Sequence, residues 1–398
     1  MDNPLARARE DAGYDQEDVA AALGVSRVMV SYWESAKRTP SDPQLAALAR
    51  LYRVTVAQLQ GDEPLPTRAD QAKMLFRGAT SGVLAADAKR GITEFADFLD
   101  RYASLSDSVK FDIRGLKSSP FLTTPGFETA ADARRKAEEV RAHLRLGLGP
   151  ISDIDSVAEL LGITVYRASL GQDLSKALSG AFFSHPNVGF SILVNLDMTP
   201  GRRRFTIAHE IAHALFHSRE QYILSGPGGG PRERFADAFA GEFLMPGEGI
   251  RRIMEEMAVG PRVTDPAAVV HIQRYFNVSY PTALFRLFRA KFLSHSHYNE
   301  FQRIRPVVFA QALGYEVSDE EFSQDPARWN VRRFPSKFLG LVRNAVHKGL
   351  ISPPSAANLT GLSIDDIEEL IADGQAPSPD PEIAREIGEF SDTVLVDS

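Results

Sequence analysis

The run 203–217, RRFTIAHEIAHALFH, constrains the fold most, because isolated polar residues recur in it at helical spacing among small and apolar neighbours. His209 and His213 are four residues apart, so on an α-helix they lie one turn apart on the same face and can point at one ion. Glu210 is rotated by about 100° from His209, which suits a base held beside a metal better than a ligand. The H-E-x-x-H pattern therefore predicts a buried helix with two imidazole ligands and a carboxylate that takes a proton from water.

Zinc needs a third protein ligand, with one coordination position left for water. The metzincin arrangement would need glycine at position 216 and histidine at position 219, but the chain has Phe216 and Arg219 there. His217 continues the four-residue spacing, yet it lies a further turn, roughly 5–6 Å, along the helix axis. We therefore interpret His217 as a structural residue or as a partner of a ligand.

The segment 231–246, PRERFADAFAGEFLMP, offers a better third ligand. Glu233 and Asp237 lie four apart on one face of the predicted helix, and this Glu-x-x-x-Asp pattern after H-E-x-x-H resembles that of gluzincins. The resemblance implies that Glu233 binds the metal, while Asp237 hydrogen-bonds a ligand histidine from outside the ligand set. Two alternatives stay open: Glu233 as an acidic residue favoured by the helix dipole, and Glu242 as the ligand. Two imidazoles and a carboxylate favour Zn²⁺, and they also suit Mn²⁺ or Fe²⁺.

The N-terminal 60 residues predict five short helices. Residues 16–23 form the second, Gly24 ends it, and Ser26 is a good N-cap for a third helix over 27–36. Two short helices joined by a tight glycine-containing turn form a helix-turn-helix, whose second helix enters the DNA major groove.

The run 16–59, QEDVAAALGVSRVMVSYWESAKRTPSDPQLAALARLYRVTVAQL, resembles the Cro/CI or XRE family of helix-turn-helix repressors. The resemblance implies binding to a double-stranded DNA operator, with a homodimer as the expected form. The residues expected to contact bases are Ser26, Arg27, Val28, Ser31 and Tyr32. Lys37 and Arg38 are expected to lie near phosphates.

The charge of this segment departs from that of a strong DNA binder. Residues 1–60 contain seven basic and eight acidic side chains, a net charge of −1. Non-specific affinity depends on neutralising phosphates, so we expect it to be weak. The alternative is a five-helix bundle that binds protein or only dimerises.

The middle of the chain predicts a small β-sheet before the histidine-bearing helix. Strands are expected over 163–167, 180–184 and 189–195, with His185 as a turn residue, and a helix over 130–145 precedes them. We expect the strand 189–195 to hold an extended substrate by β-strand addition. The segment SGPGGGPRE, 225–233, is interpreted as a flexible loop at the edge of the site.

The ordered run SGAFF, FSILVN, RRRFTIAHEIAHALFH and ERFADAFAGEFLMP resembles the ImmA/IrrE family of metallopeptidases over roughly residues 130–290. Family members are metal-dependent endopeptidases, and several cleave helix-turn-helix repressors that control stress, mobile-element or phage-defence genes. Some members carry their own XRE domain. Two positions depart from the family pattern: Phe235, where an acidic residue is common, and Asp237, where asparagine is common.

Length and composition agree with a multidomain cytoplasmic protein. The chain has 398 residues, 43% of them hydrophobic and 24% charged, which predicts two or three domains. Its apolar runs are too short to cross a membrane, and without cysteine any metal must be held by His, Asp or Glu.

We predict a mostly helical α+β protein. The expected domains are a five-helix DNA-binding domain over 1–62, a linker and helical connector over 63–129, a zincin-like peptidase domain with a small sheet over 130–295, a C-terminal helical partner or sensor module over 296–375, and a disordered tail over 376–398.

The leading functional hypothesis is a DNA-binding transcriptional regulator with a zinc endopeptidase that cleaves a repressor-type protein. One alternative is a non-proteolytic repressor or antitoxin-like protein whose peptidase fold senses metal or binds a partner. A housekeeping peptidase with a vestigial N-terminal domain is the third.

Overall fold

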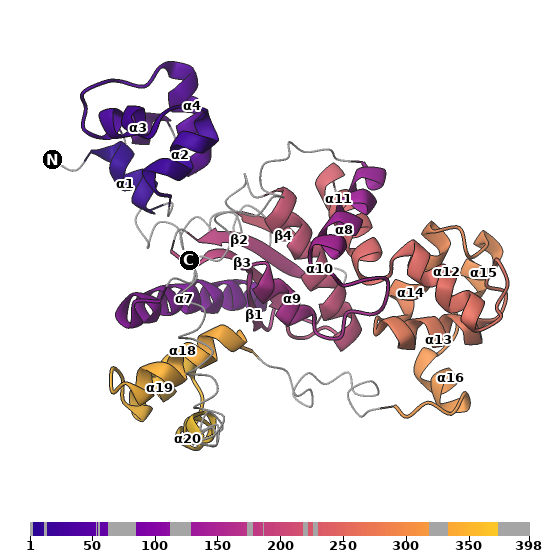
Figure 1. Ribbon diagram of the computed structural model, residues 1–398. Helices are drawn as coiled ribbons and strands as arrows, with labels where there is room; N and C mark the ends of the chain where they lie inside the picture. The colour runs from indigo at the N-terminus through magenta and orange to yellow at the C-terminus, as the bar shows by residue number, and fades with distance from the viewer. Residues whose placement is uncertain are drawn as a thin grey trace, which may run out of the picture. The chain divides into compact units, whose positions relative to one another are not determined.

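The computed structural model describes residues 3–11, 14–52, 54, 56–62, 85–111, 129–172, 178–185, 187–217, 222–225, 230–317 and 333–372. The chain divides into two compact units, one of residues 1–100 and 113–335 and the other of residues 101–112 and 336–398. The described elements are mostly helices with one four-stranded sheet, which confirms the predicted fold class (Figure 1). None of the described helices is long and apolar enough to cross a membrane. The expected tail, most of the expected linker and residues 226–229 of the loop 225–233 lie outside the described residues.

The N-terminal domain has the five expected helices, α1 (Pro4–Asp11), α2 (Gln16–Leu23), α3 (Arg27–Glu34), α4 (Asp42–Tyr52) and α5 (Val56–Gln60). Gly24 ends α2 in the left-handed conformation at φ 67°, and the Ser26 hydroxyl accepts from the Met29 amide to cap α3. Val19, Trp33 and Leu48 form part of a separate apolar core for this domain. The tight turn between α2 and α3 therefore follows from the glycine and serine in the sequence.

The sheet contains β1 (Thr164–Ala168), β2 (Gly180–His185), β3 (Gly189–Asn195) and β4 (Tyr222–Ser225), in the order β1-β3-β2-β4. β1 runs parallel to β3, whereas β2 is antiparallel to both β3 and β4. β3 is hydrogen-bonded on both edges, so the prediction that residues 189–195 add a substrate strand is wrong. The sequence analysis also missed β4, a strand of only four residues.

Helices cover both faces of the sheet. On one face, Phe182, Ile192 and Val194 belong to the same core as the apolar residues of α10 (Pro200–Phe216). On the other face, the Tyr166 ring stacks on Phe98 of α7 (Ala86–Val109), with ring centroids 4.5 Å apart. Burial on both faces explains why β2 and β3 read as apolar runs instead of alternating residues.

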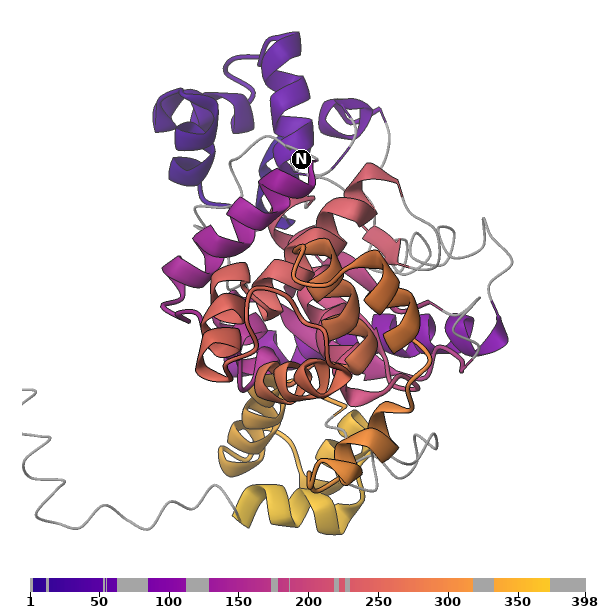
Figure 2. The ribbon, with the colours of Figure 1, turned by 90° about the vertical axis from the view of Figure 1, so that its right-hand side faces the viewer.

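The remaining helices of this domain pack around α10. They are α8 (Ala130–His143), α9 (Ile154–Leu160), α11 (Pro231–Leu244), α12 (Gly247–Glu256), α13 (Pro266–Phe276), α14 (Tyr280–Arg289), α15 (His295–Phe301) and α16 (Pro306–Ala312). α12 to α16 gather at one end of the domain (Figures 1 and 2). Phe301 of α15 and Ala310 of α16 belong to the same core as the sheet. The core of the domain thus extends beyond residue 295.

The second unit combines the last turns of α7 with α18 (Ser336–His347), α19 (Pro353–Thr360) and α20 (Ile364–Ala372). The Tyr102 ring meets Phe338 edge-on at 5.3 Å between centroids, and the Arg101 guanidinium donates to the Leu359 carbonyl at 3.0 Å. Gly361 ends α19 in the left-handed conformation, and the Ser352 hydroxyl caps its start. This unit contains α18 to α20, the later part of the helical module expected over residues 296–375, whereas α15 and α16 belong to the other unit.

A buried ion pair joins α11 to α14. The guanidinium of Arg286 donates to the Glu242 carboxylate and, at 3.0 Å, to the Met245 carbonyl. The Gly247 amide donates to the same carboxylate at 2.7 Å. The Glu242 carboxylate therefore holds α14 against α11.

Replacing Glu242 with alanine should lower the free energy of unfolding by about 3 kcal/mol, because the Arg286 charge would stay buried without its partner. Urea denaturation followed by circular dichroism measures this change. Glu248→Ala is the matched control, since Glu248 pairs with Arg251 on the exposed surface and its loss should cost at most about 0.5 kcal/mol. Equal effects of the two substitutions would contradict the structural role of Glu242.

Candidate metal centre and DNA-binding face

Adjacent helices bring three predicted ligands together. His209 and His213 lie on α10, and their Nε2 atoms are 3.1 Å apart. The Glu233 carboxylate, from the first turn of α11, lies 3.2 Å from His209 Nε2 and 3.3 Å from His213 Nε2. These residues form a group that could hold a metal ion within the described part of the chain.

The donor set and its spacing suit zinc. Tetrahedral coordination with bonds of about 2.0–2.1 Å separates neighbouring donor atoms by roughly 3.3–3.4 Å. The two Nε2 atoms are 3.1 Å apart, and the Glu233 carboxylate approaches His209 Nε2 at 3.2 Å through Oε2 and His213 Nε2 at 3.3 Å through Oε1, all close to that value. Two imidazoles and one carboxylate are also the ligand set of catalytic zinc sites that keep an open position.

Asp237 lies one helical turn after Glu233, and its Oδ1 is 2.9 Å from His209 Nδ1. This contact orients the imidazole so that Nε2 faces Glu233 and His213. Burial lowers the pKa of His209, but the hydrogen bonds with Asp237 and Glu233 outweigh it and raise that pKa to about 10. Burial raises the pKa of Glu233, whereas its hydrogen bonds with both histidines lower it to about 2. The carboxylate is therefore held in its charged form.

His217 contacts the other histidine of the centre. Its Nδ1 is 2.9 Å from His213 Nδ1, on the side of that ring away from Glu233. Its ring also packs edge-on against Phe235, with centroids 5.2 Å apart. Burial lowers the pKa of His217 to about 3, so this imidazole is neutral. His217 thus lies where a partner of a ligand was expected.

Glu210 is fully buried, at 0% exposure, between α10 and the sheet. Neither of its carboxylate oxygens makes a well-formed hydrogen bond with the described residues, and nor does the buried Ser225 hydroxyl on β4. Burial raises the pKa of Glu210 to about 7, although the charge of His209 and the Ser225 hydroxyl act against that rise. A buried carboxylate of this kind can exchange a proton near neutral pH.

Gly180 on β2 makes room for this carboxylate. A Cβ atom at position 180 would lie 2.9 Å from Glu210 Oε1, 2.8 Å from the Leu193 carbonyl and 2.7 Å from Thr206 Cγ2. Any side chain there would displace the carboxylate or the helix. The sequence alone does not show that Gly180 and Ser225 lie near Glu210, because this depends on the packing of β2 against α10 and on the pairing of β2 with β4.

Two other residues that the sequence singled out, Glu242 and His185, make structural contacts away from the candidate metal centre. Glu242, the alternative third ligand, binds Arg286 and the Gly247 amide instead of the histidines. His185, the expected turn residue, ends β2, and its Nδ1 accepts from the amides of Asn187 and Val188 at 3.2 and 3.1 Å. It fixes the turn between β2 and β3.

The predicted DNA contacts lie along α3 and the turn after it. Arg27 and Val28 are exposed at the start of this helix, Val28 by 56%, and Tyr32 is 37% exposed one turn later. Ser31 is half-buried on the same helix, while Ser26, Lys37 and Arg38 are exposed. The Lys37 ammonium lies 5.7 Å from the Tyr32 ring centroid, so the cation and the aromatic ring share one face.

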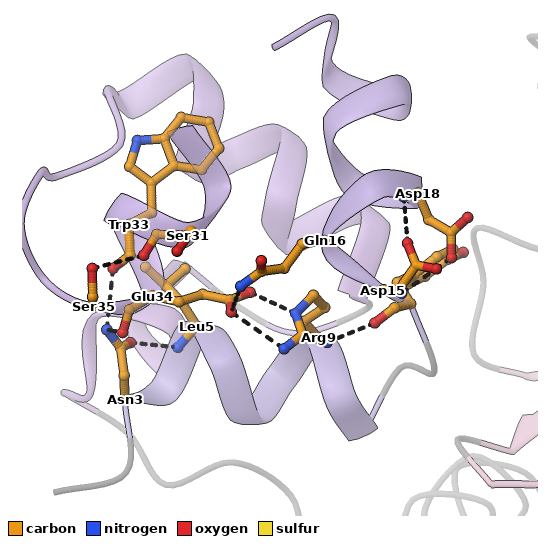
Figure 3. Close-up of polar contacts among 11 residues, drawn as sticks. Asn3, Leu5, Arg9, Asp15, Gln16, Asp18, Ser31, Trp33, Glu34 and Ser35 are labelled. Carbon is orange, nitrogen blue, oxygen red and sulfur yellow. Dashed lines mark hydrogen bonds and ion pairs between the residues drawn. The ribbon is translucent and has the colours of Figure 1, made fainter. Parts of the chain in front are cut away.

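A polar network inside the domain fixes α1, α2 and α3 together (Figure 3). The Glu34 carboxylate accepts from Arg9 Nε at 2.5 Å and from Gln16 Nε2 at 2.9 Å. Arg9 also donates to the Tyr14 carbonyl at 2.8 Å. This network uses one of the few basic side chains internally, so the positive charge of the α3 face comes from Arg27, Lys37 and Arg38.

Comparison with known families finds two domain models that match parts of the chain. Residues 5–59 match the family model of helix-turn-helix domains, and residues 158–288 match that of the IrrE N-terminal-like domain. No curated protein matches the chain. The predicted fusion is confirmed: the chain carries an XRE-type helix-turn-helix domain, which supports DNA binding, and an IrrE-like domain of a metallopeptidase family.

Zinc affinity tests the assignment of the ligands. Glu233→Ala should abolish stoichiometric binding, and Asp237→Ala should weaken it by about 10- to 100-fold, because the His209 ring would lose its orienting partner. Competition with a chromophoric chelator measures both affinities. His295→Ala, at an exposed histidine on α15, should leave the affinity unchanged. Full zinc affinity in Glu233→Ala would rule out this ligand set.

Proposed function

We propose that this fusion of a helix-turn-helix domain with an IrrE-like peptidase domain is a transcriptional regulator that hydrolyses a peptide bond in another regulatory protein. The convergence of His209 Nε2, His213 Nε2 and the Glu233 carboxylate is the observation that carries the proposal. These three residues would hold zinc, and Mn²⁺ or Fe²⁺ would suit the same donors. When bound, the metal would polarise the carbonyl of the scissile bond as a Lewis acid.

Glu210 is the proposed acid–base group. It takes a proton from the attacking water and returns that proton to the amine that leaves. Its position next to His209 in sequence, its burial and its raised pKa support this role. Asp237 and His217 orient the two ligand histidines through their second ring nitrogens.

β4 is the proposed site of substrate addition, in place of β3. It is the last strand of the sheet and pairs only with β2 among the described strands. Its Ser225 lies near Glu210, so an extended chain added along β4 would run beside the proposed acid–base group.

The helix-turn-helix domain supports a protein substrate that acts at a promoter. We propose that α3 reads an operator and thereby concentrates the peptidase where repressor proteins also bind. The substrate on this proposal is a repressor-type protein, in accordance with the family resemblance of the peptidase domain. We also propose that residues 1–62 read DNA, that the peptidase activity belongs to the domain that begins at residue 130 and whose core includes Phe301 and Ala310, and that α18 to α20 of the second unit form a partner or sensor module.

Glu210→Gln should bind one zinc ion, as the wild type does, but should cleave a regulator encoded beside its gene at least about 100-fold more slowly. The amide keeps the shape of the carboxylate but cannot take the proton. Mass spectrometry of the products and metal analysis of both proteins provide the two measurements. Glu248→Gln, at an exposed site on α12, is the control and should retain full activity. If wild type and variant both bind zinc and neither cleaves, the non-proteolytic alternative holds.

Arg27→Ala should reduce operator affinity by about 10-fold or more and relax the preference at one base position, as expected for a base contact. Lys37→Ala should weaken binding to all sequences alike, because a phosphate contact carries no sequence information. Selection from random duplexes gives the operator, and fluorescence anisotropy gives the affinities. Wild-type binding by both variants would indicate that α3 does not enter the groove.

A further inference from the structure

A wide cleft lies between α10, α11, α13 and α14, beside the candidate metal centre, although none of the three candidate ligands lines it. Its volume is about 1930 Å³, and Asp237, the partner of His209, is one of the residues that line it. Phe205, one turn before His209 on α10, also lines it. Pockets for small molecules usually measure roughly 300–1,000 Å³, so this volume suits a segment of a macromolecule.

The charge of the cleft lining is strongly positive. Eight arginine and lysine side chains line it, against the two aspartates Asp197 and Asp237. This contrasts with the chain as a whole, whose net charge is −7. A concave surface lined by one sign of charge concentrates its field and attracts ligands of the opposite sign.

Several of these cations have no acidic partner. Arg286 is committed to Glu242, but Arg202, Arg262 and Lys291 are exposed and make no ion pair with the described residues. Arg289 is also exposed, and its guanidinium lies 5.9 Å from the Phe285 ring centroid instead of beside a carboxylate. Arg262 and Lys291 lie close together, because the Val263 amide donates to the Phe292 carbonyl at 2.8 Å.

The lining also offers apolar contacts between the cations. Phe285 is 48% exposed, and the partly buried Phe288 and Val307 line the same cleft. Alternating guanidinium and apolar groups suit a polypeptide that carries both carboxylates and apolar side chains. The apolar side chains between the cations favour such a polypeptide over the continuous phosphate backbone of a nucleic acid.

We propose that this cleft binds an acidic segment of the protein substrate, adjacent to the bond that is cut. The inference rests on the proposed peptidase function, and it names the substrate class: a regulator with a run of Asp and Glu residues on one side of the cleavage site. Arg262, Arg289 and Lys291 pair with these carboxylates, and Phe285 packs against the side chains between them. The segment is thereby held in register with the metal centre.

The test measures binding without turnover. The full chain with Glu210→Gln is saturated with zinc and titrated against fluorescein-labelled twelve-residue peptides of alternating Glu and Ser, Gly and Ser, or Lys and Ser. We expect the acidic peptide to bind at least about 10-fold more tightly than the other two and to lose affinity as the salt concentration rises. The double substitution Arg262→Glu and Arg289→Glu should remove this preference, whereas Arg303→Glu, at an exposed site outside the cleft, should preserve it.

Three outcomes would overturn the inference: equal binding of the acidic and neutral peptides, an acidic preference that survives the double substitution, or displacement of the acidic peptide by a random oligonucleotide whose binding needs Arg262 and Arg289. The last experiment is run in an Arg27→Ala background, which weakens the binding of DNA by α3, and the required dependence on Arg262 and Arg289 excludes the binding that remains there. Near-ultraviolet circular dichroism confirms that each variant is folded.

Failure of the cleft and failure of the peptidase can be told apart. If the wild type cleaves a regulator but the double substitution leaves the affinity for the acidic peptide unchanged, only the role of the cleft is refuted. Selective binding of the acidic peptide without any cleavage by the wild type would instead refute only the hydrolytic function.

Discussion

The packing of α10 on α11 is the contact on which the candidate centre depends. Phe216 near the end of α10 meets Phe235 and Phe239 of α11, with ring centroids 5.6 and 5.5 Å apart. Burial of each such ring contributes roughly 1.5–3 kcal/mol, and the rings fix the separation of the two helices. Because Glu233 lies on the turn before Phe235, the same packing sets its distance from the two histidines. Apolar contacts thus determine the geometry of a polar site.

Burial of so many polar groups requires that each has a partner. Asp237 contacts the Nδ1 atom of His209, and His217 contacts the Nδ1 atom of His213. Glu233 contacts the Nε2 atoms of both histidines. An unpaired polar group in such surroundings costs about 1–3 kcal/mol. Glu210 is the exception among these residues, since its carboxylate has no well-formed hydrogen bond. Such an uncompensated group is commonly found where a protein uses its chemistry.

The sequence predicted the five N-terminal helices, the two helices that carry the histidines and Glu233, the three longer strands and the residues that converge on the centre. Helical spacing identifies His209 with His213 and Glu233 with Asp237, because each pair lies within one helix. It could not identify β4, whose four residues are too few to show a period, or the central position of β3, which depends on long-range pairing. The cleft could not be predicted from the sequence either, because Arg262 and Arg289 come together only through the fold. Local pattern thus predicts elements and pairs within them, whereas tertiary pairing decides edges and surfaces.

Gly180 carries no functional group, yet a Cβ atom there would meet the Glu210 carboxylate and the backbone of β3 at once. His209 and His213 share α10 with Glu210, so a displacement of that helix would also reach two of the metal ligands. The space for the proton-transferring group is therefore set by a strand that carries no ligand, at a residue thirty positions earlier in the chain. A single added methyl group there would disturb the capacity to move a proton, although no chemically active residue has been replaced.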